Sequence, residues 1–375
     1  MSVDVALRVA REIAAGRPLS PSRTRVRATR RAAVGDPQAS LEKFFEVLHE
    51  NELLGNDGFL GPEVQLVSAG DHFDFGPGRE RRTARESGFA LLSWLRAHSP
   101  AQVVLLAGNH DLGRVGELAS YEDESFDALA EAAIAAYRDG DVDPELERAL
   151  LDRHPALPSA ELAARDYSAY STAQRELVWT LLTERRLRLA HADSGLLFCH
   201  AGVTQRHLTA IGLPEGKMRD AVAVAGALNA ALDAAVARGR AVPFTIPGLH
   251  RPGDRAHGEG GGILYHRPQN PELPSGAEHD VTDLLGRRFD PRGLPLGLTQ
   301  VIGHVGDAKC RELLGPWAQG EPAAGALRHL RTDGARVRYA RGVPDAHGDA
   351  GEATLIFIDG QMHGTAADRY ELFEW

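Results

Sequence analysis

The chain has 375 residues, of which 43% are hydrophobic and 25% charged, and its formal net charge is −10. This composition is typical of a globular protein with a sizeable core, and the acidic balance argues against nucleic acid or an anionic membrane as a partner. Cys199 and Cys310 are too few for a disulfide framework, which favours the reducing cytoplasm. No uninterrupted apolar stretch of about 18 residues occurs, and charged residues interrupt the N-terminal segment, so we expect no transmembrane helix and no signal peptide.

Short apolar runs alternate with amphipathic segments through the first third of the chain. We expect buried strands at 32–34, 64–69 and 103–107, and helices at 40–50 and 82–98. Ser40 is the expected cap of the first of these helices. Upstream, five arginines within residues 23–31 form a basic patch, which we interpret as a solvated approach to the first strand.

Two longer segments interrupt this alternation. The helical stretches 125–138 and 172–186 predict a helical insertion that forms a cap. A second insertion contains a helix over 218–238 and then a Gly- and Pro-rich loop over 247–274. The glycine triplet of this loop lacks the Lys-Ser/Thr that follows a phosphate-binding loop. The predicted organisation is a single domain over residues 1–375, with the helical insertion at about 112–195 and the second insertion at about 203–298.

Short polar motifs follow the apolar runs, each at the carboxyl end of a run. They are GDPQ at 35–38, GDHFD at 70–74, GNHD at 108–111, His200 after 196–199, and Gly303-His304 after 301–302. About 35 residues separate Asp36 from Asp71 and about 38 separate Asp71 from Asn109, enough for a strand, a helix and a return strand. Parallel strands connected in this way place all the motifs at one edge of a sheet, where ligands bind.

The motifs combine carboxylate, imidazole and amide groups. Hard divalent or trivalent cations bind carboxylates, with imidazole and amide oxygen completing the shell, and one carboxylate can bridge two ions about 3.5–4 Å apart. The candidate ligands are Asp36, Asp71, Asn109, His200 and His304. Asp71 follows the middle one of the first three strands, so it is the natural bridge. Such a pair of ions activates water for in-line attack on a phosphoryl group.

The order of these motifs resembles that of the calcineurin-like metallophosphoesterases, and most closely that of the phosphoprotein phosphatase branch. The family motifs GDxHG, GDxxDRG, GNHE, HGG and GH stand here as GDPQA, GDHFDFG, GNHD, HAG and GHVG. The resemblance covers residues 34–359, because LIFID at 355–359 is similar to the closing strand of the family. It implies an α/β fold, a metallophosphoesterase-type α/β sandwich with two insertions.

The resemblance also implies a role for each motif residue. The first metal would be bound by Asp36, Gln38 and Asp71, and the second by Asp71, Asn109, His200 and His304. His110 would be the general acid that protonates the leaving oxygen, and Asp74 would hold its ring. The implied cofactors are two divalent or trivalent ions, of Mn, Fe or Zn.

Three positions depart from the family pattern. Gln38 replaces a histidine, and an amide oxygen is a harder and weaker ligand than imidazole. Phe75 replaces an arginine that grips phosphate, and Ala201 interrupts the HGG motif. We expect another cation to replace that arginine, and the candidates are Arg267, which follows shortly after an aromatic residue, and Arg251.

The predicted function is hydrolysis of a phosphate ester or anhydride by metal-activated water, as a phosphatase or phosphoesterase of the cytoplasm. The phosphorylated substrate is a protein or a small molecule: a phosphoprotein, a dinucleoside polyphosphate and a small phosphomonoester are alternatives. The alternative function, motivated by Gln38 and Phe75, is a catalytically weakened metallophosphoesterase fold that acts as a binding or scaffold protein. A ligand role for Asp359 or His363 stays open, and the sequence gives no oligomeric state.

Overall fold

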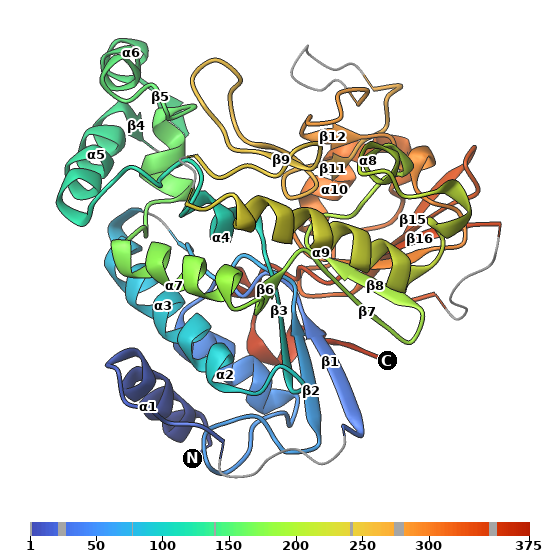
Figure 1. Cartoon of the computed structure of the whole chain (residues 1–375), viewed down its shortest axis with the longest axis horizontal. Helices are drawn as coiled ribbons and strands as arrows, with labels where there is room; N and C mark the ends of the chain where they lie inside the picture. Colours follow the sequence, from blue (N-terminus) through green and yellow to red (C-terminus); the bar gives the residue numbers. More distant parts are fainter. Residues whose placement is uncertain are drawn as a thin grey trace.

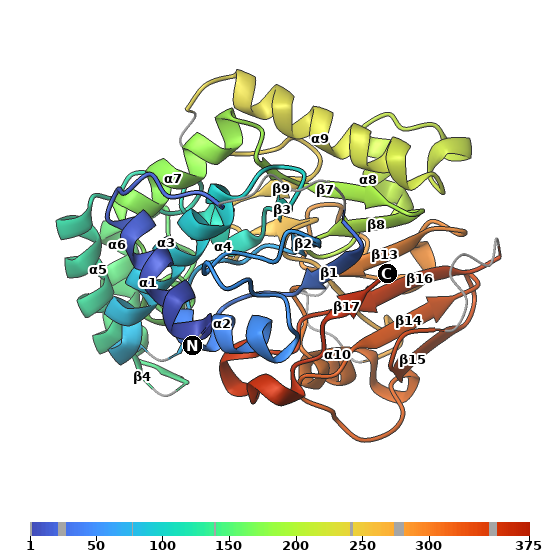
Figure 2. The same cartoon turned by 90° about the horizontal axis from the view of Figure 1, so that it is seen from below.

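The computed structural model describes residues 2–21, 28–76, 78–138, 140–240, 243–273, 281–344 and 351–375. Two β-sheets lie at its centre (Figures 1 and 2). The first sheet has the strand order β17-β1-β2-β3-β6, with β1 (Arg30–Val34), β2 (Val64–Ser68), β3 (Val103–Leu106), β6 (Leu187–Arg188) and β17 (Phe373–Glu374). The second has the order β15-β14-β16-β13-β8-β7, with β7 (Ala190–Asp193), β8 (Leu196–Cys199), β13 (Thr299–Ile302), β14 (Arg328–Thr332), β15 (Val337–Arg341) and β16 (Ala353–Phe357).

Helices and three short ladders complete the described part of the chain. The helices are α1 (Ser2–Ala14), α2 (Leu41–Glu50), α3 (Arg81–Ala97), α4 (Asn109–Gly113), α5 (Asp123–Ala136), α6 (Pro144–Arg153), α7 (Thr172–Thr183), α8 (Gln205–Ala210), α9 (Ala221–Ala237) and α10 (Asp307–Leu314). The ladders pair β4 (Tyr137–Arg138) with β5 (Asp141–Val142), β9 (His250–Arg251) with β10 (Gly261–Gly262), and β11 (Arg267–Pro268) with β12 (Arg288–Phe289).

The two sheets pack face to face, and helices cover their outer faces. Ala33 of β1 and Val67 of β2 belong to a core cluster that contains strand residues of both sheets and no helix residue. Their neighbour Ala32 points the other way, into the core shared with α2 and α3, as the two-residue period of a strand requires. In Figure 1, α2, α3 and α7 lie on the side of the first sheet, and α9 lies along β7 and β8 of the second. The predicted α/β sandwich is therefore confirmed.

The helices predicted next to the first strands are α2 and α3. The hydroxyl of Ser40 accepts the backbone N–H of Lys43 at 3.2 Å, so the predicted N-cap is present. Phe44 and Phe45 meet Trp94 of α3 edge to face, with ring centroids 6.1 and 5.0 Å apart. These contacts hold both helices against the first sheet and position the turns that follow β1, β2 and β3.

The prediction that all motifs lie at the edge of one sheet is wrong. Strands β1, β2 and β3 are parallel, and β8, β13 and β16 are parallel in the other sheet, so each sheet gathers its own carboxyl ends at one edge. Asp36, Asp71 and Asn109 follow strands of the first sheet, whereas His200 and His304 follow strands of the second. Because the sheets are stacked, their two edges meet, and the motifs gather between the layers.

The segments between the motifs fold into helices and loops around this edge. Helices α5 and α6 and the π-helical turn Leu162–Asp166 enclose a small core of their own, which includes Phe126, Leu157 and Tyr170. The glycine triplet serves close packing, since a Cβ on Gly261 would collide with the backbone oxygen of Leu285. The division into one domain with two insertions stays a prediction.

The remaining expectations concern the surface. Arg30 and Arg31 of the basic patch form ion pairs with Glu374 and Asp193, and the rest of its arginines lie outside the described residues. Within the described ranges, the structure has no helix that is both long enough and apolar enough to span a membrane.

Candidate metal centre

The turns that carry the motifs are held in strained backbone conformations. Asp71, Asp74 and His304 have positive φ angles of 55°, 63° and 65°, a region that residues other than glycine rarely adopt. The buried carboxylate of Asp111 stabilises the first of these turns by accepting the backbone N–H groups of Asp71 at 2.9 Å and of Gly108 at 2.8 Å. The turns after β2 and β3 are thereby tied together, and Asp71 projects between the sheets.

His200 and His304 face each other across the meeting edges. The Nδ1 of His200 lies 2.9 Å from the backbone oxygen of Ala69, and the Nε2 of His304 lies 2.9 Å from that of Tyr265. A carbonyl can only accept, so these nitrogens carry the protons and the other nitrogen of each ring keeps a lone pair. The two lone-pair nitrogens are 3.2 Å apart, closer than two acceptors remain without a cation or proton between them.

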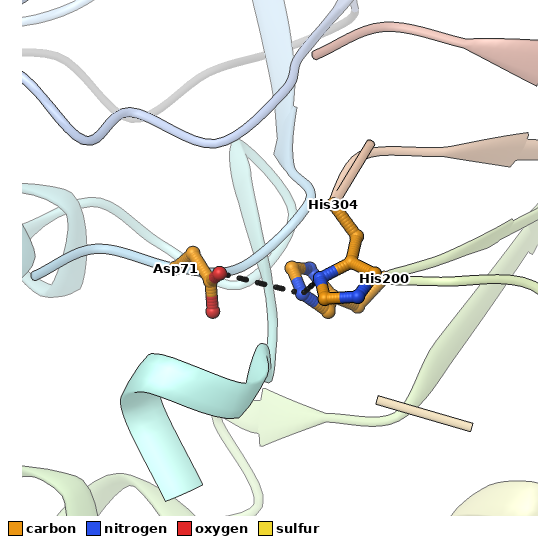
Figure 3. A group of neighbouring side chains, drawn as sticks. All are labelled: Asp71, His200 and His304. Carbon is orange, nitrogen blue, oxygen red and sulfur yellow. Dashed lines mark hydrogen bonds and ion pairs between the residues drawn. The ribbon is translucent and has the colours of Figure 1, made fainter. Parts of the chain in front are cut away.

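Asp71 and Asn109 complete this group. An oxygen of Asp71 lies 3.5 Å from Nε2 of His200, and Figure 3 shows the carboxylate directed at the two imidazoles. The amide oxygen of Asn109 lies 3.1 Å from the same nitrogen and faces only acceptors; the amide turned over would donate N–H to them at 3.1–3.3 Å. The present orientation of the amide would be the favourable one if a cation were held by these atoms. Among the described residues, Asp71, His200 and His304 form the one cluster of acidic, histidine or cysteine side chains with metal-binding spacing.

Carboxylates accumulate on the other side of Asp71. The carboxylate of Asp36 accepts the backbone N–H of His304 at 2.9 and 3.0 Å. Burial, and then the nearby carboxylates of Asp359 and Asp71, raise the pKa of Asp36 well above its usual value. Burial also raises the pKa of Asp359, and the charge of Asp71 adds to it. Three mutually repelling acidic groups fit a site that takes a second cation.

Gln38 and Asp359 belong to this half of the centre. The amide nitrogen of Gln38 donates to the backbone oxygen of Phe73 at 3.1 Å, which leaves the amide oxygen as the atom suited to a metal. Both residues line a cavity of about 420 Å³ together with Asp36, Asp74, Phe75 and His363. The ring of Phe75, at the position of the family's arginine, lies 5.4 Å from the ring of His363 and supplies no charge.

His110 is held by a buried ion-pair network. Its Nδ1 lies 2.8 Å from Asp74, and the same carboxylate oxygen accepts from the guanidinium of Arg114 at 2.6 Å. Burial opposes protonation of His110, but the carboxylates of Asp71 and Asp74 outweigh it and raise the pKa of the imidazole to about 9. Burial opposes ionisation of Asp74, and Arg114 and His110 reverse this, so the pKa of Asp74 is lowered. Nε2 of His110 is 3.9 Å from Asp71 and faces the centre.

The two arginine candidates occupy different places. Arg267 lines a cavity of about 380 Å³ whose lining includes Asn109 and His110, so it reaches the centre. Arg251 lines a neighbouring cavity with Arg255, His257 and Glu259, which contains none of the predicted ligands.

Several residues of the centre were not predicted from the sequence. Arg114 follows His110 by one helical turn, and that spacing is the one signal that could have indicated it. Tyr167 meets the ring of His110 edge to face at 4.9 Å, and its hydroxyl lies 3.0 Å from that of Tyr265. Tyr265 in turn donates to the buried carboxylate of Glu117 at 2.7 Å. The segments between the motifs thus brace the centre from outside the two sheets.

Comparisons with known proteins bear on the same region. The model of one protein family, described as calcineurin-like phosphoesterase, matches residues 29–208. That segment carries the motifs from Asp36 to His200. No curated protein matches the chain.

Proposed function

We propose that this chain, which belongs to the calcineurin-like phosphoesterase superfamily, is an active metal-dependent hydrolase of phosphate esters or anhydrides. One observation carries the proposal: the ligand atoms of Asp71, Asn109, His200 and His304 converge with no donor among them, beside a histidine that is already held as an acid. A binding protein has no need of that acid or of the buried pair that holds it.

The residues divide between two metal positions. Asp71, Asn109, His200 and His304 would hold one ion with two nitrogen and two oxygen donors. Asp36 and Asp71 would hold the other. Gln38, which replaces the histidine of the family, offers a further oxygen atom, and so does Asp359. The donor set of Asp36, Gln38, Asp71 and Asp359 is richer in oxygen, so we expect this first metal position to prefer a hard ion such as Mn²⁺ or Fe³⁺ to a softer one. Bound ions would supply Lewis-acid polarisation of the phosphoryl group and an activated water.

Side chains of the protein protonate the leaving oxygen and bind the phosphoryl oxygens. His110 donates the proton of Nε2 to the leaving oxygen, while Asp74 and Arg114 keep the ring in place. Arg267 approaches the phosphoryl oxygens and compensates for the charge that is lost at Phe75. A guanidinium suits this task because its planar fork matches two oxygens of a phosphate.

The test combines metal analysis with turnover. Purified protein is freed of metal, reloaded with Mn²⁺, Fe or Zn²⁺, and assayed for bound metal by elemental analysis and for hydrolysis of p-nitrophenyl phosphate and its bis ester. We expect two metal equivalents per chain and turnover that chelation abolishes and metal restores. Two bound equivalents with no turnover on a broad panel of phosphate esters and anhydrides would refute the proposal in favour of the scaffold function.

A further inference from the structure

The cavity beside the metal centre is lined with cations. It holds about 380 Å³ and contains the side chains of Asn109 and His110 at the centre. Its charged lining residues are the cations Arg165, Arg267, Arg287, Arg288 and Lys309, and the anions Asp166 and Glu259. These five cations and two anions leave a net charge of +3, before protonated His110 is counted, in a chain whose formal net charge is −10. The lining of this cavity is therefore positive although the chain as a whole is acidic.

Three of the five cations form ion pairs with carboxylates of the protein. Arg165 pairs with Asp166 at 2.8 Å, Arg287 with Glu259 at 2.5 Å, and Lys309 with Glu312 at 2.7 Å. Arg267 and Arg288 have no ion pair with any carboxylate in the described part of the chain. The side chain of Arg288 is buried, only 6% of the residue is exposed, and its Nε has no hydrogen-bond partner.

The backbone forces these two arginines together. Strands β11 and β12 are parallel, and Arg267 and Arg288 are direct partners in that ladder. Like charges opposite each other destabilise a sheet, and burial, together with Arg267 and Arg287, lowers the pKa of Arg288 to about 10. A conflict of this kind persists in folded proteins mainly where function requires it. An anion bound in the cavity that both arginines line would reduce this repulsion.

The two arginines line the same cavity as Asn109 and His110 of the centre. The charges of Arg267 and Asp71 act on each other, and burial and then the charge of Arg267 lower the pKa of His304, so we assign Arg267 to the phosphate position nearest the centre. The charged groups that act on Arg288 are Arg267, Arg287, Glu259 and Glu312, and Glu312 is the partner of Lys309. Arg288 lies beside Arg267 in the β11–β12 ladder and lines the same cavity as Lys309, a cavity whose lining does not include Asp71 or His304.

We propose that Arg288, with Lys309 behind it, forms a subsite for a second phosphate, so that the substrates are phosphoanhydrides that carry a phosphate next to the scissile one. This rests on the proposed function, because the scissile phosphate lies at the metal centre beside Arg267. Water forms the new P–O bond and releases a proton to solvent, the bridging P–O bond breaks, and its electron pair leaves with the second phosphate. His110 protonates that leaving oxygen and takes a proton back from solvent. Neighbouring phosphates share one bridging oxygen, which suits two adjacent arginines.

The first experiment measures binding without turnover. Inorganic tripolyphosphate and inorganic phosphate are titrated into metal-free protein by calorimetry, so that hydrolysis and metal chelation do not interfere. We expect tripolyphosphate to bind at least about tenfold more tightly than phosphate, and Arg288→Gln to weaken tripolyphosphate by about 10- to 100-fold, the range for hydrogen bonds to charged groups. Arg288→Lys should restore part of the loss because it keeps the charge without the fork.

Two further variants distinguish a loss of tripolyphosphate binding from misfolding of the Arg288 variants. Lys309 is 43% exposed, so Lys309→Gln should fold normally and lower tripolyphosphate affinity by a smaller factor. Arg255, paired with Asp152 and 43% exposed, lines only the neighbouring cavity, so Arg255→Gln is the matched control and should change nothing. Equal binding of tripolyphosphate and phosphate, or a loss in Arg255→Gln as large as in Lys309→Gln, would overturn the subsite.

The second experiment measures selectivity in the metal-loaded protein. We expect Arg288→Gln to lower kcat/KM for pyrophosphate relative to that for p-nitrophenyl phosphate by about tenfold or more. If p-nitrophenyl phosphate is hydrolysed but this ratio is unchanged, the subsite is wrong and the hydrolase proposal stands. If tripolyphosphate binds through Arg288 but nothing is hydrolysed, the subsite stands and the hydrolase proposal fails. Preference for an acidic phosphopeptide over pyrophosphate would also refute the anhydride class.

Discussion

The buried pair of Asp74 and Arg114 supports both stability and catalysis, and replacing first one partner and then both separates the two effects. Asp74→Asn keeps the shape of the side chain but removes the charge that faces Arg114 at 2.6 Å. The two side chains are 4% and 0% exposed, so water cannot replace the lost carboxylate. The substitution leaves a buried guanidinium without a counter-charge and His110 without its ionised acceptor.

The magnitude follows from this burial. Removing one partner of a buried ion pair costs about 3–5 kcal/mol, whereas exposed pairs contribute less than about 1 kcal/mol. We therefore expect Asp74→Asn to lower the free energy of unfolding by about 3–5 kcal/mol. Turnover should fall by about 10²- to 10⁴-fold, the usual contribution of a positioned acid.

Replacing both partners distinguishes this mechanism from general damage. Asp74→Asn/Arg114→Met removes the uncompensated charge, so unfolding in urea should show recovery of about 0.5–3 kcal/mol relative to additive single effects. Turnover should not recover, because His110 still lacks its carboxylate. Arg82→Gln, which breaks an exposed pair with Glu86, is the control and should be nearly neutral. Strictly additive losses, or recovery of turnover in the double variant, would refute the assignment.

Other substitutions test the metal positions and the acid. Asp71→Asn should remove most bound metal and all turnover, because Asp71 serves both positions; two retained equivalents with normal turnover would contradict the bridge. His110→Ala should keep the metal but lower kcat by about 10²- to 10⁴-fold, with smaller losses for substrates whose leaving groups have a low pKa, and a uniform loss would exclude the acid role. Gln38→His should shift metal preference towards later transition metals, measured by competitive metal binding, and an unchanged ranking would place Gln38 outside the site. Asp359→Asn should weaken one of two metal equivalents in calorimetric titrations, whereas two unchanged affinities would exclude Asp359 as a ligand.

Local features of the chain were sufficient to predict most of the helices and strands and the types of residue in the metal centre. The cap at Ser40, the helices that follow, and the apolar runs of β1, β2 and β3 depend on neighbours in the chain, so periodicity and side-chain chemistry reveal them. The motif residues stand at strand ends for the same reason. Their order led to the family, which the match over residues 29–208 supports for the motifs from Asp36 to His200.

Pairings between distant segments could come only from the tertiary structure. The motifs belong to two sheets, which a sequence of alternating strands and helices does not distinguish from one. The sequence ranked Arg267 before Arg251 as a candidate, and the second insertion folds so that Arg267 shares a cavity with Asn109 and His110 whereas Arg251 lines a neighbouring one. Arg114 and Arg288 had no motif at all. Their roles arise because packing excludes water around them, and a charge acquires a strong energetic effect only when its surroundings no longer screen it.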